Sequence, residues 1–162
     1  MHAHDLKLLL IDAIISNLKT DLETAVAQAL GAHDAATHEE SAAENKYDTF
    51  GLESGYLASG LSRRVREIEQ SLQAYRDMMP RAFNVDDEIR LTALVTLDND
   101  ESLQYFLGPG AAGLVLSFED CAVRVITPQA PLGQQLLGKR VGDDIQLMQK
   151  GALIPASITD VA

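Results

Sequence analysis

The chain lacks the residues that would fix it by disulfide bonds or hold it in a membrane. Cys121 is the single cysteine among 162 residues, which excludes an internal disulfide bond. It lies beside a predicted strand, where we expect a small buried hydrophobe. No apolar run approaches the length of a membrane span. The apolar stretch 8–15 is framed by Asp5 and Asp12 and has no small-residue cleavage site after it. We therefore expect a cytoplasmic protein with no membrane partner.

Positive charge and aromatic residues are also scarce. The chain has 13 Lys and Arg residues against 24 Asp and Glu residues, a formal net charge of -11. Affinity for a phosphate backbone depends on basic side chains, so this balance disfavours unaided nucleic-acid binding. It fits a protein partner or a metal better. Aromatic residues make up 5% of the chain and tryptophan is missing, a composition that is typical of long helices when alanine and leucine are abundant.

Several motifs of self-contained enzymes and metal proteins are missing. No G-x-S-x-G nucleophile elbow occurs. The glycine-rich stretch 108–113 lies between predicted strands, so we predict a turn there and no phosphate-binding loop. A closed four-ligand zinc set is not expected, because the histidines lack close ligand spacing apart from the first two. The four are His2, His4, His33 and His38.

Residues 6–36 are predicted to form one helix, because no glycine or proline interrupts them before Gly31. Their apolar residues recur at steps of three and four. Such a helix would be about 46 Å long, more than a small core needs, so part of it should project or pair with a similar helix. The apolar residues are Leu8, Ile11, Ile15, Leu18, Leu22, Ala25 and Ala29.

A second apolar stripe with the same spacing follows. Two helices with matching apolar seams predict an antiparallel helical hairpin, and two helices of an ordinary bundle are the alternative. The second stripe consists of Leu57, Leu61, Val65, Ile68, Leu72 and Tyr75.

The segment between the helices, residues 37–55, has no apolar seam and forms the predicted tip. From the residues alone it would be a solvated acidic loop, because it contains five acidic residues and only one basic residue, Lys46. Likewise, the only basic cluster would be a solvated helix face. The acids are Glu39, Glu40, Glu44, Asp48 and Glu53, and the cluster is Arg63, Arg64 and Arg66.

From Met79 and Pro80 onward the helical spacing stops, so we predict a hinge there. Short alternating stretches then predict mainly antiparallel strands, with one helical turn at 134–137. We therefore predict an α+β protein with a helical hairpin at 1–79 and a β domain at 80–162. The predicted strands cover 89–96, 102–107, 114–118, 122–126, 145–148 and 156–161.

The stretch Thr127–Asp143 carries two prolines, three glycines and a Lys-Arg pair. This block resembles the "T/S-P-x-S-P-x-G-x-x-L-x-G-K-x-x-G-D" block of the Gre-type transcript-cleavage factors of bacterial RNA polymerase. Ala130 departs from the usual serine, which should weaken a loop hydrogen bond. The stretch 105–113 resembles a further family region more loosely. The matching residues of the block are Thr127, Pro128, Pro131, Gly133, Leu137, Gly138, Lys139, Gly142 and Asp143.

The resemblance is to a divergent member of that family. It implies an FKBP-like C-terminal domain that docks on RNA polymerase near the secondary channel. The hairpin would then enter the channel, stimulate intrinsic transcript cleavage and touch the nascent RNA transiently. The polymerase would remain the catalyst. No stably bound cofactor is implied, only Mg²⁺ shared with the polymerase active site. The implied docking residues are Thr127, Pro128, Pro131, Leu132 and Gly133.

The tip resembles the family's "E-N-x-E-Y" motif at residues 44–47 with one residue missing. A tip carboxylate would hold the second Mg²⁺ of a two-metal hydrolysis. Glu44 is the first candidate, Glu40 the second and Asp48 the third. Arg63, Arg64 and Arg66 would form a nucleic-acid patch beside the tip.

Two other functions stay open. The first is a secondary-channel regulator or inhibitor without cleavage activity, which the extra tip residues 49–55 favour. The second is an interaction module whose hairpin dimerises.

Overall fold

The structure, a computed structural model, describes residues 2–42 and 49–162, without the side chains of residues 36–58. Of the tip candidates, Glu44 and Asp48 lie outside the described residues, and for Glu40 only the backbone is described. The chain divides into two compact units: Ser16–Gln73 forms one, and Met1–Ile15 together with Ala74–Ala162 forms the other. No helix in the described part of the chain is long and apolar enough to cross a membrane.

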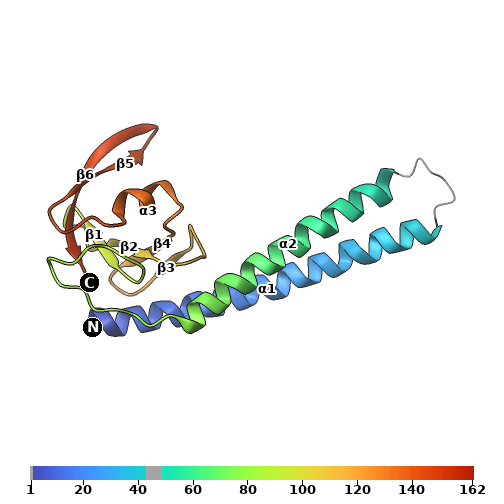
Figure 1. The fold of residues 1–162 in the computed structure, drawn as a ribbon, viewed down its shortest axis with the longest axis horizontal. Helices are drawn as coiled ribbons and strands as arrows, with labels where there is room; N and C mark the ends of the chain where they lie inside the picture. The colour runs from blue at the N-terminus through green and yellow to red at the C-terminus, as the bar shows by residue number, and fades with distance from the viewer. Residues whose placement is uncertain (1, 43–48) are drawn as a thin grey trace. The chain divides into compact units, whose positions relative to one another are not determined.

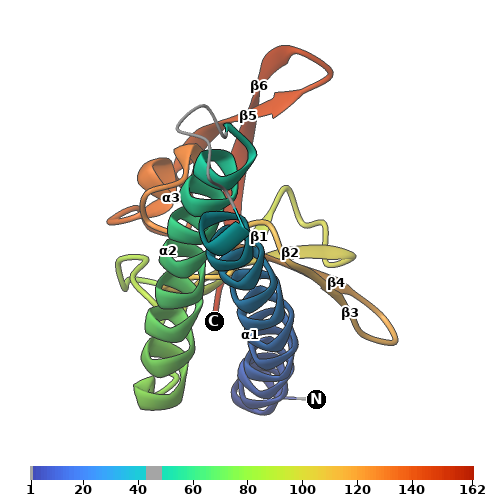
Figure 2. The same cartoon turned by 90° about the vertical axis from the view of Figure 1, so that its right-hand side faces the viewer.

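The first unit is a pair of helices that run side by side in opposite directions (Figures 1 and 2). Helix α1 spans Ala3–Ala42 and α2 spans Thr49–Asp77, so each also extends into the second unit. Their buried residues follow alternating steps of three and four, which is the spacing of an antiparallel coiled-coil seam. The predicted hairpin is therefore confirmed. The seam is built from buried Leu18, Ala25, Ile68 and Leu72 with half-buried Leu22, Ala29, Leu61 and Val65.

Two details of the helix prediction were wrong. The helices are longer than expected, since α1 continues to Ala42 and α2 begins at Thr49, which leaves a shorter connection than 37–55. Near the start of α1 the apolar stripe is also rotated from the predicted one. Leu8 is 44% exposed, whereas Lys7, Leu10 and Ile14 are buried. This part of α1 belongs to the unit of the sheet, so its buried face differs from the hairpin seam.

The second unit contains one six-stranded sheet in the order β3-β4-β2-β1-β6-β5. All neighbouring strands are antiparallel except β2 and β4. With the short helix α3, Pro131–Leu136, this confirms the α+β class and the mainly antiparallel domain. The strands are β1 (Leu94–Leu97), β2 (Leu103–Leu107), β3 (Val115–Ser117), β4 (Ala122–Ile126), β5 (Asp144–Gln149) and β6 (Ala152–Val161).

The first strand begins five residues later than predicted. The alternation from Ile89 looked like one strand, but Thr92 adopts a positive φ of 78°, which breaks an extended chain. Ile89 instead bonds to the loop after α3: its N–H donates to the Lys139 carbonyl (2.8 Å), and its own carbonyl accepts from Gly138 N–H (2.9 Å). The core of the unit forms around the sheet and α3. It includes Ile89, Val95, Leu97, Leu107, Ile126, Leu136 and Ile158, with partly buried Phe83 packed against it.

The ends of both helices are joined to the sheet unit by polar contacts. Lys7 is 1% exposed; its Nζ donates to the Arg81 carbonyl (2.6 Å) and lies 4.7 Å from the centre of the Phe83 ring. Burial lowers the pKa of Lys7 to about 8. Tyr75 is also buried, and loss of solvent raises the pKa of its phenol above its usual value. The domain boundary near residue 79 stays a prediction.

Candidate functional site

The block Thr127–Asp143 begins where β4 ends and passes through α3 into β5. Pro131 is the first residue of α3, where its missing N–H and fixed φ suit a helix start. Ala130 occupies the N-cap position and makes no side-chain cap, in line with the bond expected to weaken there. Backbone bonds close the turn: Ala130 N–H donates to the Thr127 carbonyl (3.1 Å), and Gln134 N–H donates to the Ala130 carbonyl (2.9 Å).

Gly133 is required by close packing. A Cβ atom at this position would overlap the backbone carbonyl of Thr127. That carbonyl already accepts the bond from Ala130, so it cannot move away without opening the turn. Glycine is therefore the residue that lets α3 begin directly against the loop Thr127–Ala130.

The second half of the block is shaped by two turns. Gly138 and Gly142 have φ of 83° and 94°, values that L side chains rarely adopt. The Asp143 carboxylate accepts a hydrogen bond from Arg140 N–H (2.8 Å), and Asp143 N–H donates back to the Arg140 carbonyl (3.1 Å). This reciprocal pair explains why a Gly-Asp step follows the Lys-Arg pair.

The leucine that anchors α3 is Leu136, and the match to Leu137 was wrong. Leu136 is fully buried in the core, whereas Leu137 is 48% exposed. Counting from Gly133, Leu136 also stands three residues on, which is where the pattern has its leucine. Burying Leu136 holds α3 against the sheet and leaves Leu137 at the surface.

Gln135 connects α3 to β5, the strand at one edge of the sheet. Its side-chain amide donates to the Gln146 carbonyl (2.8 Å) and its amide oxygen accepts from Gln146 N–H (2.7 Å). This pair could not be predicted from the sequence, because polar residues on a short helix usually face solvent. The pair contributes to a fixed placement of α3 on β5.

The residues expected to dock differ in their accessibility. Pro131 is exposed, Pro128 and Leu132 are half-buried, and Thr127 and Gly133 are buried. Gln129, which lies between the two prolines, is exposed as well. The loop can therefore offer a partner Gln129, Pro131 and parts of Pro128 and Leu132, while Thr127 and Gly133 support it from inside.

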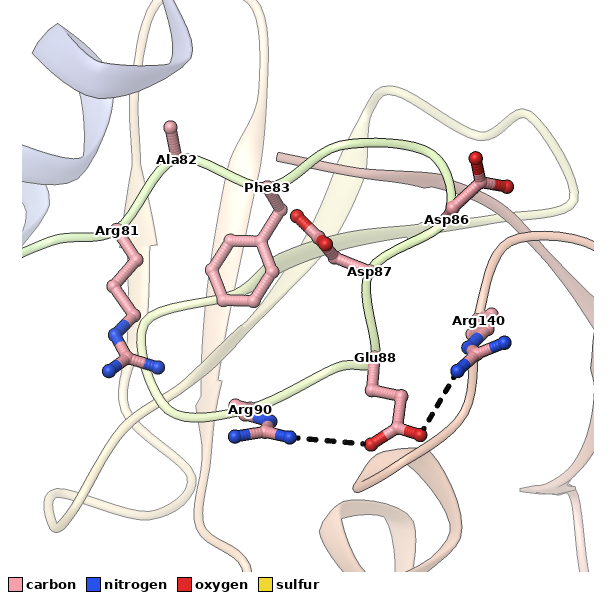
Figure 3. Close-up of a pocket in the computed structure, with 8 residues that line it drawn as sticks. All are labelled: Arg81, Ala82, Phe83, Asp86, Asp87, Glu88, Arg90 and Arg140. Carbon is pink, nitrogen blue, oxygen red and sulfur yellow. Dashed lines mark hydrogen bonds and ion pairs between the residues drawn. The ribbon is translucent and has the colours of Figure 1, made fainter.

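At the other end of the block, Arg140 lines a charged cavity of about 420 Å³, shown in Figure 3. Glu88 lies between two arginines there: its carboxylate is 3.2 Å from Arg140 and 3.5 Å from Arg90. All three side chains are more than a third exposed, so these ion pairs stabilise the fold little. Their effect is to orient Arg140 of the block and Arg90 of the segment before β1.

Of the predicted metal and nucleic-acid residues, Glu40 and the three arginines lie on the helices. Arg63, Arg64 and Arg66 are exposed on α2, and Arg64 forms a loose ion pair with Glu67 at 3.9 Å. Glu40 falls within α1. The described residues hold no cluster of three or more His, Cys, Asp or Glu side chains that could bind a metal ion.

Comparison with known proteins gave matches only among solved structures. No family model matches the chain, and no curated protein matches it. The crystal structure of GreA factor homolog 1 (Gfh1) of Thermus thermophilus is 20% identical, with a TM-score of 0.36, over 91% of this chain and 94% of that chain. A structure of the transcription factor Gfh1 is 22% identical, with a TM-score of 0.38, over 91% and 92% of the two chains. Thermus aquaticus Gfh1 is 21% identical, with a TM-score of 0.38, over 90% and 92%.

Proposed function

We propose that this protein is a Gre-type accessory factor of RNA polymerase that docks through the loop Thr127–Gly133. The observation that carries the proposal is the construction of the block Thr127–Asp143. Its resemblance to the Gre-type block rests on fixed glycines, prolines and an aspartate, and each of these has a defined place. Gly133 avoids a clash, Gly138 and Gly142 make turns, and Asp143 closes one of them.

The physical character of the loop supports a docking role. Gln129 and Pro131 are exposed, and the backbone beneath them is held by hydrogen bonds and by the buried side chain of Leu136. A loop that is already ordered loses little conformational entropy on binding. The net charge of -11 also favours a protein partner over a bare nucleic acid.

The helical hairpin would bring the tip to the polymerase active site. In this proposal α1 and α2 enter the secondary channel, and carboxylates at the tip help to hold the second Mg²⁺ of the polymerase active site. Glu44, Glu40 and Asp48 remain the candidates, and transcript cleavage remains the proposed outcome. Arg63, Arg64 and Arg66 are exposed on α2 and would meet the nascent RNA there.

Docking is tested by measuring binding to bacterial core RNA polymerase. Pro131→Ala and Gln129→Glu should weaken binding because both alter the exposed part of the loop. Gln149→Glu is the matched control, since Gln149 is exposed at the end of β5 and outside the loop. If folded loop variants bind as well as the control, the loop is not part of the interface. If the wild type does not bind polymerase at all, the proposed function is wrong.

Cleavage is tested on stalled elongation complexes. The Glu40→Ala, Glu44→Ala double variant should lose cleavage and still bind polymerase, because docking would depend on the loop Thr127–Gly133, which belongs to the other unit. Glu23→Ala, an exposed acid on α1, is the control. A wild type that binds but does not cleave at saturating Mg²⁺ would favour the regulator without cleavage activity. A fully active double variant would direct attention to Asp48.

A further inference from the structure

The loop before α3 lacks the usual support at a helix start. Ala130 occupies the N-cap position with φ −67° and ψ 150°, the extended conformation of an N-cap residue. Its methyl group cannot accept a hydrogen bond from the first turn of the helix, and α3 has no side-chain cap. The start of α3 therefore relies on bonds made to the backbone of the loop itself.

Gln134 donates to two consecutive carbonyls of the loop. Its Nε2 donates to the Gln129 carbonyl (3.0 Å), and its backbone N–H donates to the Ala130 carbonyl (2.9 Å). The peptide between Gln129 and Ala130 is then bonded at both ends, because the Ala130 N–H donates to the Thr127 carbonyl (3.1 Å). Since a peptide unit is planar, these two bonds fix its orientation. The Gln134 side chain makes one of the two.

Gln134 lies on a helix that is fixed to the rest of the sheet unit. Leu136 is fully buried in the core, and Gln135 exchanges two hydrogen bonds with Gln146 on β5. By contrast, Gln129 is exposed in the loop. The bond from Gln134 therefore ties an exposed part of the loop to a helix that is held in place on its other side.

The bond acts mainly on the conformation of the loop. Gln134 and Gln129 are both exposed, and a hydrogen bond that competes with water contributes little to the free energy of unfolding. A bond of this strength can still shift a local equilibrium between loop conformations several-fold. A loop that already has its bound conformation binds more tightly without any added contact.

We propose that Gln134 is a positioning residue, which holds the Gln129 carbonyl so that the exposed side of the loop Thr127–Gly133 keeps one conformation. Its side chain takes over, from within α3, the ordering role that an N-cap serine at position 130 would have. The inference rests on the proposed function for the partner that binds the loop. The bond itself can be tested without that partner.

The first test measures amide hydrogen exchange in the protein alone. Gln134→Met keeps the length and helix preference of the side chain but removes the donor. The protection factor of the Ala130 amide should then fall at least threefold. The Leu137 amide, which donates to the Gly133 carbonyl (3.0 Å) at the end of α3, should keep its protection. A loss of global stability would instead lower both.

Two rescue variants and one control accompany this measurement. Gln134→Lys restores a donor and should protect the Ala130 amide as the wild type does. Adding Ala130→Ser to Gln134→Met should also restore protection at position 130, because the backbone there already has the geometry that suits an N-cap serine. Gln149→Met makes the same replacement at an exposed site on β5 and should have no effect.

The second test measures binding to bacterial core RNA polymerase. Gln134→Met should weaken binding about threefold, because part of the loop population leaves the bound conformation. Adding Ala130→Ser should restore binding, and neither substitution changes the charge.

The outcomes separate this inference from the docking proposal. If the protection factor at Ala130 does not fall in Gln134→Met, or falls equally at Leu137, the inference is wrong. If it falls but this variant binds polymerase like the wild type, while Pro131→Ala weakens binding, the loop docks without the help of Gln134 and the inference is again wrong. If the wild type does not bind polymerase, the proposed function is wrong, whereas the exchange test still decides whether Gln134 holds the loop.

Discussion

The Tyr75 hydroxyl donates a buried hydrogen bond of 2.8 Å to the carbonyl oxygen of Gly110. Its ring also occupies the space where a side chain at position 108 would lie, because a Cβ on Gly108 would overlap the Tyr75 hydroxyl. One residue near the end of α2 thus fits into the loop 108–113 both by a bond and by shape. The family resemblance of that loop was the weaker part of the sequence match, and this contact gives Gly108 a physical reason.

A double-mutant cycle tests the contact. Tyr75→Phe should lower the free energy of unfolding by about 1 kcal/mol through the lost hydrogen bond. Gly108→Ala should lower it by about 1–3 kcal/mol through overpacking. The two changes should not add, because Tyr75→Phe removes the atom that the new methyl group meets. Urea denaturation of the four proteins measures the coupling, and strictly additive losses would show that the two residues act independently.

The buried Lys7 predicts an unusual dependence of stability on pH. Burial lowers its pKa from 10.5 to about 8 in the folded chain. Between these values the unfolded chain binds more protons, so the free energy of unfolding should rise from about pH 8 to pH 10.5. The gain should be at most about 3 kcal/mol, because the bond to the Arg81 carbonyl and the Phe83 ring favour the charged form. Lys7→Met should remove this rise, and Lys19→Met, at an exposed site on α1, should keep it.

Tyr75 has the opposite effect at higher pH. Burial raises the pKa of its phenol, so above about pH 10 the unfolded chain loses a proton that the folded chain keeps. Stability should then fall as the pH rises further, and the fall should be smaller in Tyr75→Phe. Thermal melting of the wild type and the variants across pH 7 to 11 measures both effects. A Lys7→Met protein with the same rise as the wild type would show that another group causes it.

Gly133→Ala should be strongly destabilising, by several kcal/mol, on the order of the larger single-site effects in proteins. The added Cβ meets backbone that the turn cannot release. Gly60→Ala is the matched control, because the space around Gly60 on α2 is open, and there alanine should stabilise by about 0.5–1 kcal/mol. Chemical denaturation of both variants measures their free energies of unfolding. Equal values would mean that the backbone of Thr127–Ala130 can shift at little energetic cost.

The fragment 80–162 should fold by itself. The buried core that contains Val95, Leu107, Leu136 and Ile158 lies wholly within it. It lacks Lys7 and Tyr75, so we expect a cooperative melt at a lower temperature than for the full chain. A fragment 74–162, which keeps Tyr75, should melt between the two. Circular dichroism during heating measures this, and a fragment 80–162 without cooperative melting would show that the helix ends complete the core.

The local sequence pattern predicted much of the fold. It missed features that depend on contacts between residues far apart along the chain. The helical seam from Leu18 to Ala29 was visible because it repeats regularly, and glycine and proline marked the turns of the block. Lys7 was missed because a lysine is usually exposed, and its burial depends on the Arg81 carbonyl and the Phe83 ring far along the chain. The late start of β1 was missed because the apolar alternation from Ile89 hides the positive φ of Thr92. Met79, Leu91 and Pro128 line one groove, which the sequence could not predict, because only the fold brings these residues together.

The bond between Gln135 and Gln146 has a consequence for solubility. β5 is the last strand of the sheet, so the Gln146 N–H and carbonyl would otherwise be open to a strand of another molecule. Gln135 occupies both groups, and opposite Gln146 on β6 stands Pro155, which has no N–H to offer. The protein can therefore expose Met148, Leu153 and Ile154 along the same ribbon without presenting a regular edge for aggregation. Light scattering during heating should accordingly begin at a lower temperature in Gln135→Ala than in Gln134→Ala.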